Sequence, residues 1–159
     1  MNAIIEPSDA RDQLVFKSET VSKTLRLTRE DIMAFARMSE DNNPLHYDLM
    51  AAQRAQFGEI IASGQHSAAL LIGMLATHFS RSDDGVQREM LCLNMNFSFK
   101  GPVFADQEVQ LRWVVADMHW NSKLRGMLAL LDGTAMVTAG KPAVIARGTI
   151  LVKEVKIDN

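Results

Sequence analysis

Residues 67–79 read SAALLIGMLATHF, and this stretch decides the fold that the sequence predicts. Its apolar side chains fall on every side of a helix, a pattern typical of a helix that the rest of the protein encloses. Small residues recur within it and would let a sheet approach the helix closely: Ala68, Ala69, Gly73 and Ala76. We therefore expect one long buried helix at the centre of the fold.

The second half of the chain changes to the two-residue period of strands. Residues 91–99 (LCLNMNFSF) alternate apolar and polar side chains, residues 108–118 begin the same way, and residues 126–131 and 144–155 are further strand candidates. Turn signals separate them at residues 100–102, 120–122, 132–133 and 140–142. No helical pattern intervenes, so antiparallel pairing is expected. With a short strand at residues 19–27, the pattern predicts an α+β fold in which five or six strands surround one apolar helix.

Two shorter helical patterns precede the long helix. Thr28 followed by Asp31 fits an N-cap with an acid three residues later, which predicts a helix at residues 29–38. The Asn-Asn-Pro at residues 42–44 would end that helix, because proline disfavours helical geometry at the residue before it. A second helical stretch is expected at residues 47–57, with a glycine directly after it.

The length of 159 residues fits one domain, which we place at residues 14–159 after an N-terminal arm at residues 1–13. With 17 basic and 19 acidic residues, the chain has no basic excess that would attract nucleic acid. Cys92 is the only cysteine, which excludes an internal disulfide and fits a cytoplasmic setting. The first residues do not resemble a signal peptide, and the longest apolar run, residues 68–76, is too short to cross a membrane.

The polar segment SEDNNPLHYD, residues 39–48, holds the candidate catalytic residues. Asp41 and His46 are a carboxylate and an imidazole, which can share general acid–base work. Asn43 and the proline after it can form the turn that would bring the two side chains together. The same spacing also fits a solvated loop that merely ends a helix, so this pattern leaves both interpretations open.

Ser63 and Gly64 stand at the head of the apolar helix. A helix N-terminus presents free amide hydrogens and a partial positive charge, and glycine lets a carbonyl come close to the backbone. The amide of Gly64 is therefore a candidate oxyanion donor. In the alternative interpretation, Ser63 caps the helix and Gly64 makes room for packing, and the two interpretations are compatible.

No metal site or nucleophilic serine is expected. His66 and His78 do not have the spacing of a metal-binding pair, and Ser67 lacks the G-x-S-x-G setting of a nucleophile elbow. Three basic residues are candidate contacts for phosphate groups, although residues of this kind are commonly just solvated: Lys100, Arg112 and Arg125.

Residues 41–46, DNNPLH, resemble the D-x-N-P-L-H motif of the MaoC-like (R)-specific enoyl-CoA hydratases, a family with the hot-dog fold. Three further stretches resemble family segments in the same order: residues 57–64 (FGEIIASG), 97–103 (FSFKGPV) and 104–109 (FADQEV). The resemblance covers residues 15–155. The chain departs from the family pattern at Leu49, Ser63 and Ala105.

The resemblance implies a hydro-lyase of fatty acid metabolism. It would add water to trans-2-enoyl thioesters to give (R)-3-hydroxyacyl thioesters, or catalyse the reverse dehydration. Asp41 and His46 would form the acid–base pair, and the Gly64 amide would bind the substrate carbonyl. Asn43 and Ser63 would support them. No cofactor is expected beyond CoA or acyl carrier protein as substrate carrier, and pairing of two sheets implies a homodimer.

Two other functions remain open at this point. The protein could be a hot-dog acyl-CoA thioesterase, which would direct water at the carbonyl carbon instead of C3. It could also be a non-catalytic acyl-CoA-binding subunit, although a pure binder has no need for an acid–base pair.

Overall fold

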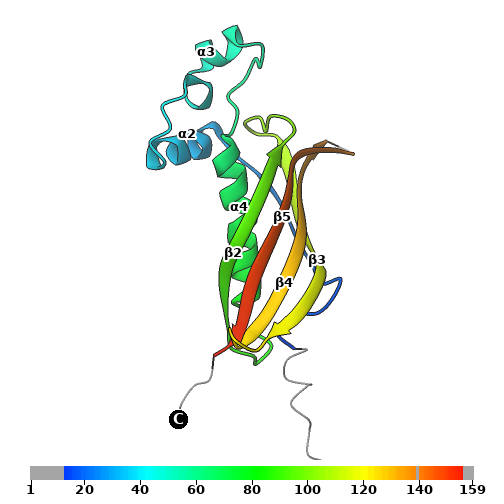
Figure 1. The fold of residues 1–159 in the computed structure, drawn as a ribbon. Helices are drawn as coiled ribbons and strands as arrows, with labels where there is room; N and C mark the ends of the chain where they lie inside the picture. Colours follow the sequence, from blue (N-terminus) through cyan, green and yellow to red (C-terminus); the bar gives the residue numbers. More distant parts are fainter. Residues whose placement is uncertain (1–12, 139, 156–159) are drawn as a thin grey trace, which may run out of the picture.

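The computed structural model describes residues 13–138 and 140–155, which form a five-stranded antiparallel sheet and four helical segments (Figure 1). The strands lie in the order β1-β3-β4-β5-β2. Their bounds are Thr20–Arg26 for β1, Arg88–Phe99 for β2, Glu108–Asn121 for β3, Gly126–Thr138 for β4 and Lys141–Glu154 for β5. All neighbouring pairs are antiparallel. The predicted α+β arrangement, an antiparallel sheet around one long helix, is confirmed.

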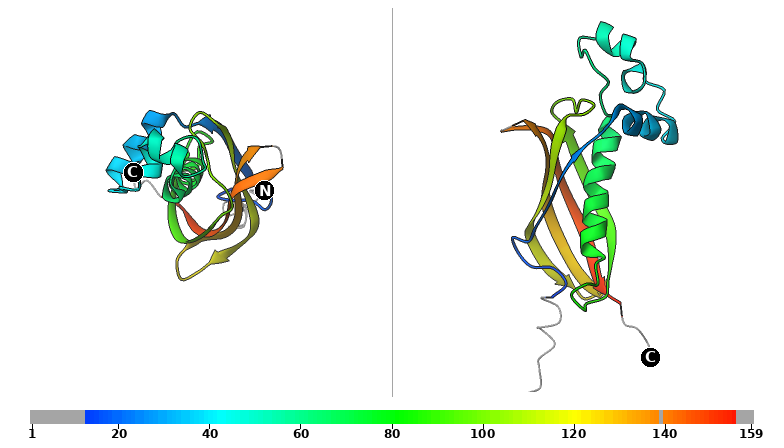
Figure 2. Two further views of the ribbon diagram at one scale, coloured as in Figure 1. Left: turned by 90° about the horizontal axis from the view of Figure 1, so that it is seen from above. Right: turned by 180° about the vertical axis from the view of Figure 1, so that it is seen from behind.

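The long helix α4, Gly64–Phe79, lies in the hollow of the curved sheet (Figure 2). Its inward side chains are fully buried against the strands and include Leu71 and Leu75. The indole of Trp113 on β3 donates a hydrogen bond from Nε1 to the Leu71 carbonyl at 2.9 Å. This contact ties the helix backbone to the sheet, because a buried indole N–H needs an acceptor.

The expectation that α4 is enclosed on every side is wrong. Ala69, Gly73 and Thr77 are exposed along a groove between α4 and β1. The sheet does not close over this side, because β1 has only seven residues and ends the sheet there. Two of the four small residues, Ala69 and Gly73, therefore face the groove and do not pack against the sheet.

The turn predicted at Asp132-Gly133 is also wrong, since β4 runs through both residues. Gly133 lies opposite Trp113 in the β3–β4 register. A Cβ atom built on Gly133 would lie 2.5 Å from the indole ring, closer than real side chains approach. The glycine is there to make room for the tryptophan.

Helix α2, Arg29–Met38, begins as the sequence predicts and ends for a different reason. Thr28 and Asp31 form the expected reciprocal capping box. The helix ends in a Schellman motif: Asp41 N–H donates to Ala36 O at 2.9 Å, and Glu40 has a φ of 56°. The proline does not end this helix.

Pro44 instead begins the short 3₁₀ helix η1, Pro44–His46, where its fixed φ suits the first position. Helix α3 is shorter than expected, Leu49–Arg54, and Gln56 and Gly58 follow it with positive φ angles. Figure 1 shows α2, η1 and α3 gathered at the N-terminal end of α4.

The predicted N-terminal arm lies outside the described residues except for Gln13, and its boundary with a single domain stays a prediction. Within the described part of the chain, none of the helices has the length and apolar character needed to cross a bilayer.

Candidate active site

The loop between α2 and α3 brings Asp41 and His46 together, as the sequence predicts. His46 Nε2 lies 3.5 Å from Asp41 Oδ2, with the two side chains 8% and 18% exposed. Asp41 is fixed by the Schellman motif at the end of α2, and His46 is the last residue of η1. The separation leaves both atoms within reach of one water molecule.

A main-chain carbonyl fixes the tautomer of His46. Its Nδ1 lies 2.7 Å from the Ile61 carbonyl oxygen. Because a carbonyl only accepts hydrogen bonds, Nδ1 must carry the hydrogen. The neutral ring therefore presents the Nε2 lone pair towards Asp41. Ile61 was not among the predicted site residues, since a carbonyl contact of this kind has no side-chain signal.

The segment that carries Ile61 is held in place from both sides. The Ile61 N–H donates to Leu45 O at 3.2 Å. Arg29 of α2 forms two hydrogen bonds to the Glu59 carboxylate, and they hold the pKa of that carboxyl below its ordinary value. The carbonyl acceptor of His46 is thereby anchored to α2 and η1.

The Asp41 carboxylate accepts one hydrogen bond on each oxygen. The main-chain N–H of Asn43 donates to Oδ1 at 3.0 Å, and the Gln65 side chain donates from Nε2 to Oδ2 at 3.1 Å. Asn43 shapes the loop as expected, because its side chain caps η1 by accepting from Leu45 N–H. Asn43 contacts the Asp41–His46 pair only through its main-chain N–H. Gln65 was not predicted, although its place directly after Gly64 was a usable signal.

Both interpretations of the Ser63-Gly64 pair find support in the geometry. Ser63 caps α4, its Oγ accepting from His66 N–H at 3.3 Å. Gly64 is the first residue of α4, and its N–H has no hydrogen-bond acceptor among the described residues. A Cβ atom at Gly64 would lie 3.0 Å from the Phe99 ring, so the glycine also makes room for packing.

His46 and Gly64 line the same cavity, which has a volume of about 500 Å³. Asn43, Ser67 and Phe99 also border it, whereas Asp41 is not a lining residue and contacts the cavity only through its neighbour His46. Of the three candidate phosphate contacts, only Lys100 lines this cavity. The arrangement can hold a water on the acid–base pair and a carbonyl oxygen on a helix N-terminus.

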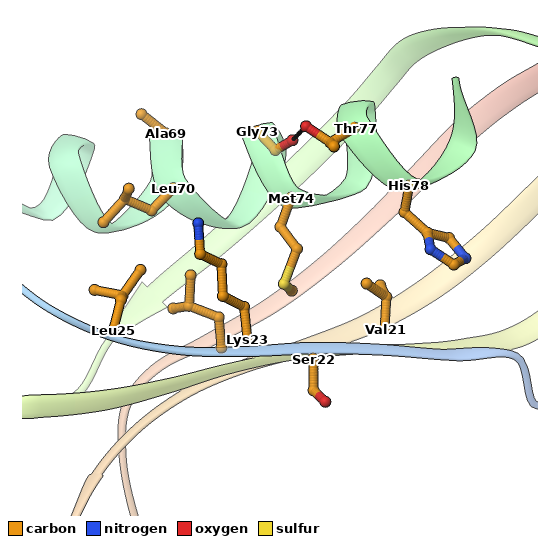
Figure 3. Close-up of a pocket in the computed structure, with 11 residues that line it drawn as sticks. Val21, Ser22, Lys23, Leu25, Ala69, Leu70, Gly73, Met74, Thr77 and His78 are labelled. Carbon is orange, nitrogen blue, oxygen red and sulfur yellow. Dashed lines mark hydrogen bonds between the residues drawn. The ribbon is translucent and has the colours of Figure 1, made fainter. Parts of the chain in front are cut away.

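A second cavity of about 480 Å³ lies in the groove between β1 and α4 (Figure 3). Its titratable lining residues are Lys23 and His78. His78 Nε2 is already held by Glu19 at 2.7 Å. The N-terminal amides of α4 do not border this cavity. It therefore lacks the donor that acyl-transfer or hydration chemistry needs.

His66 is a structural residue in this arrangement. Its ring stacks on Phe35 of α2 with a centroid distance of 4.2 Å, and burial lowers the pKa of the imidazole. Among the described residues, no group of three or more His, Cys, Asp and Glu side chains is placed to hold a metal ion.

A sheet wrapped around α4, with an acid–base pair at the helix N-terminus, defines a hot-dog protein with a candidate thioester site. A family model described as "MaoC like domain" matches residues 14–129, and the chain belongs to this family. An (R)-specific enoyl-CoA hydratase from Aeromonas caviae is 28% identical over 134 residues, covering 80% of this chain and 96% of that protein. The solved structure of the A. caviae (R)-hydratase involved in PHA biosynthesis matches with a TM-score of 0.72 at 26% identity, over 86% of this chain and 96% of that one.

Plant relatives match over part of their length. A mitochondrial 3-hydroxyacyl-[acyl-carrier-protein] dehydratase from Solanum lycopersicum is 23% identical over 106 residues, which is 67% of this chain and 59% of that protein. The corresponding enzyme from Arabidopsis thaliana is 26% identical over 64% of this chain and 57% of its own length. The chain thus spans less than two thirds of these two relatives.

Proposed function

We propose that this protein is a hydro-lyase that adds water to trans-2-enoyl thioesters to give (R)-3-hydroxyacyl thioesters, and catalyses the reverse dehydration. One observation carries the proposal: His46 and Gly64 line the same cavity, and Asp41 Oδ2 lies 3.5 Å from His46 Nε2. The hydratases and dehydratases among the relatives support it.

The acid–base pair binds and activates the water. The 3.5 Å gap lets the water donate one hydrogen to His46 Nε2 and the other to Asp41 Oδ2. The water oxygen attacks C3 of the enoyl group, forming the C–O bond as one O–H bond breaks. The proton stays on the pair and is then delivered to C2, which forms the C–H bond of the product.

The N-terminus of α4 stabilises the charge that develops during this addition. When water attacks C3, electrons move onto the thioester oxygen to form an enolate. The Gly64 N–H and the positive end of α4 bind that oxygen more strongly as its charge grows. The reaction is not a redox change, so it needs only the acyl carrier, CoA or acyl carrier protein. Lys100 at the cavity is available to a carrier phosphate.

The decisive experiment follows crotonyl-CoA and longer enoyl-CoAs by loss of enoyl absorbance, with free thiol measured in parallel. Loss of the enoyl signal without thiol release is the expected result. Thiol release without loss of the enoyl group would identify a thioesterase. Tight acyl-CoA binding without any turnover would identify a binding subunit. Either of these outcomes would overturn the proposal.

The active form is a homodimer in which β2 strands of two copies pair. β2 is an edge strand, and it carries Leu91 and Leu93, each 49% exposed. Edge strands with exposed apolar residues are prone to pairing with another chain. Sedimentation analysis should give the mass of a dimer, and a monomer at micromolar concentration would contradict this part of the proposal. A cytoplasmic setting, suggested by the lone Cys92, stays a prediction.

A further inference from the structure

Gln65 connects the long helix to the acid–base pair. It is the second residue of α4, and its side-chain amide donates to Asp41 Oδ2 at 3.1 Å. The same oxygen faces His46 Nε2 at 3.5 Å. Gln65 does not line the site cavity, so it does not stand where the substrate would bind.

A second imidazole–carboxylate pair in the molecule shows how closely two such groups can approach, there with the charged Arg81 guanidinium on the same oxygen at 3.3 Å. Glu19 Oε1 closes on His78 Nε2 to 2.7 Å, a direct ion-pair distance. At that separation no water fits between the two groups. Asp41 has a short, rotatable side chain, and in the absence of another donor on Oδ2 it could close on His46 in the same way.

We propose that Gln65 is a positioning residue that holds Asp41 Oδ2 away from His46 and so keeps the water site open. This inference rests on the proposed hydration function. Two neutral donors hold the carboxylate, Asn43 N–H on Oδ1 and Gln65 Nε2 on Oδ2. Neutral donors orient an anion without neutralising it, which leaves Asp41 able to accept a proton.

The first test replaces Gln65 by methionine, which has a similar length and no donor. The value of kcat should fall about tenfold, the typical effect of losing one hydrogen bond to a charged group, while KM changes less than twofold. The acidic limb of the pH profile should move to higher pH. A closed ion pair favours the protonated imidazole, whereas water activation needs the Nε2 lone pair.

Gln65→Glu is the stronger variant because it removes the donor and adds a negative charge beside Asp41. Its acidic limb should move further to higher pH than that of Gln65→Met. The fold should persist, since an acid in the first turn of a helix is favourable. The matched control is Gln53→Glu, which places the same charge on an exposed glutamine of α3.

The outcomes separate this inference from the proposed function. If Asp41→Asn abolishes hydration while Gln65→Met keeps the wild-type kcat and pH profile, the inference on Gln65 is overturned and the function stands. A shift in Gln65→Glu no larger than in Gln53→Glu would also overturn it. If the wild type hydrates no enoyl thioester, both fall together.

Discussion

The two ends of α4 carry two imidazole–carboxylate pairs that differ in almost every property except their chemistry. Asp41 and His46 meet at the N-terminal end, with 3.5 Å between Oδ2 and Nε2. Glu19 and His78 meet at the C-terminal end, at 2.7 Å. By distance alone the second pair would be the better candidate for acid–base catalysis.

The C-terminal pair is saturated with partners. Glu19 Oε1 also accepts from Arg81 at 3.3 Å, and its Oε2 accepts from Phe16 N–H at 3.2 Å. The Glu19 side chain is only 4% exposed. A carboxylate with both oxygens occupied and a guanidinium beside it is a structural anchor that links β1 to the end of α4.

The helix itself gives the two ends opposite electrostatics. The N-terminal end offers the free Gly64 amide and a partial positive charge, which favour a developing enolate. The C-terminal end offers carbonyl oxygens and a partial negative charge, which oppose it. What distinguishes the candidate site is thus a looser pair next to a cavity and an amide donor, and not the closeness of the pair.

The largest expected effect separates the two histidines. His46→Gln and Asp41→Asn should each lower kcat/KM for crotonyl-CoA by about 10²- to 10⁴-fold, the usual contribution of a general acid–base group. The kcat/KM of His78→Gln should stay within about twofold of the wild-type value, because the His78 ring is hydrogen-bonded to Glu19. Initial rates on variants of verified fold would test this. Equal losses of kcat/KM in His46→Gln and His78→Gln would contradict the assignment of different roles to the two histidines.

The next effect is on stability, where the Glu19–His78 pair should matter more than the Asp41–His46 pair. Glu19→Gln should lower the free energy of unfolding by about 2 kcal/mol, since it removes the buried carboxylate that both His78 and Arg81 contact, while Asp83 and Asp84 stay near Arg81. Its kcat should be unchanged. Asp41→Asn should cost less stability, because Asp41 is more exposed and has no arginine or lysine partner among the described residues. Urea unfolding curves give both values. A stability loss at Asp41 larger than at Glu19 would contradict the assignment.

Local patterns account for much of what could be predicted from the sequence. The Thr28–Asp31 capping box and the alternating strands were predictable because each depends on residues only a few positions apart in the sequence. The D-x-N-P-L-H string carries Asp41 and His46 within one loop, so their meeting was predictable as well.

Other features depend on contacts that no local pattern records. The Asp-Gly turn signal at residues 132–133 was misleading because the demand for a glycine comes from Trp113 on the next strand. The end of α2 at Met38 was predicted, but its cause was not, because Glu40 occupies a left-handed position where glycine is usual. Gln65 reaches Asp41 across 24 residues, and Ile61 acts through its carbonyl, which every residue possesses.

A smaller effect tests the space beside Gly64 at the head of α4. Gly64→Ala should lower kcat/KM about tenfold, because the new Cβ would lie 3.0 Å from the Phe99 ring and push it into the cavity. The matched control is Gly73→Ala on the same helix, where a Cβ meets nothing within 4 Å. That variant should keep its activity and gain about 0.5–1 kcal/mol of stability. Equal activity of the two variants would show that space at Gly64 does not matter.

The smallest effect concerns the other imidazole on α4, His66, which is buried without a carboxylate bonded to it. Burial lowers the pKa of this imidazole, more than Asp31 opposes the change, and its Nδ1 has no hydrogen-bond partner. Below the unfolded value of 6.5 the unfolded chain therefore binds more protons than the folded one, and stability falls as pH falls. One such group contributes at most about 1.4 kcal/mol per pH unit.

His66→Phe keeps the stack on Phe35 and removes the titration. Its unfolding free energy should therefore decline less than that of the wild type between pH 7 and pH 5. Urea unfolding at several pH values measures the two slopes. Identical slopes would assign the pH dependence to other groups. A shallower slope would assign part of the pH dependence to the buried imidazole of His66, which has no carboxylate bonded to it.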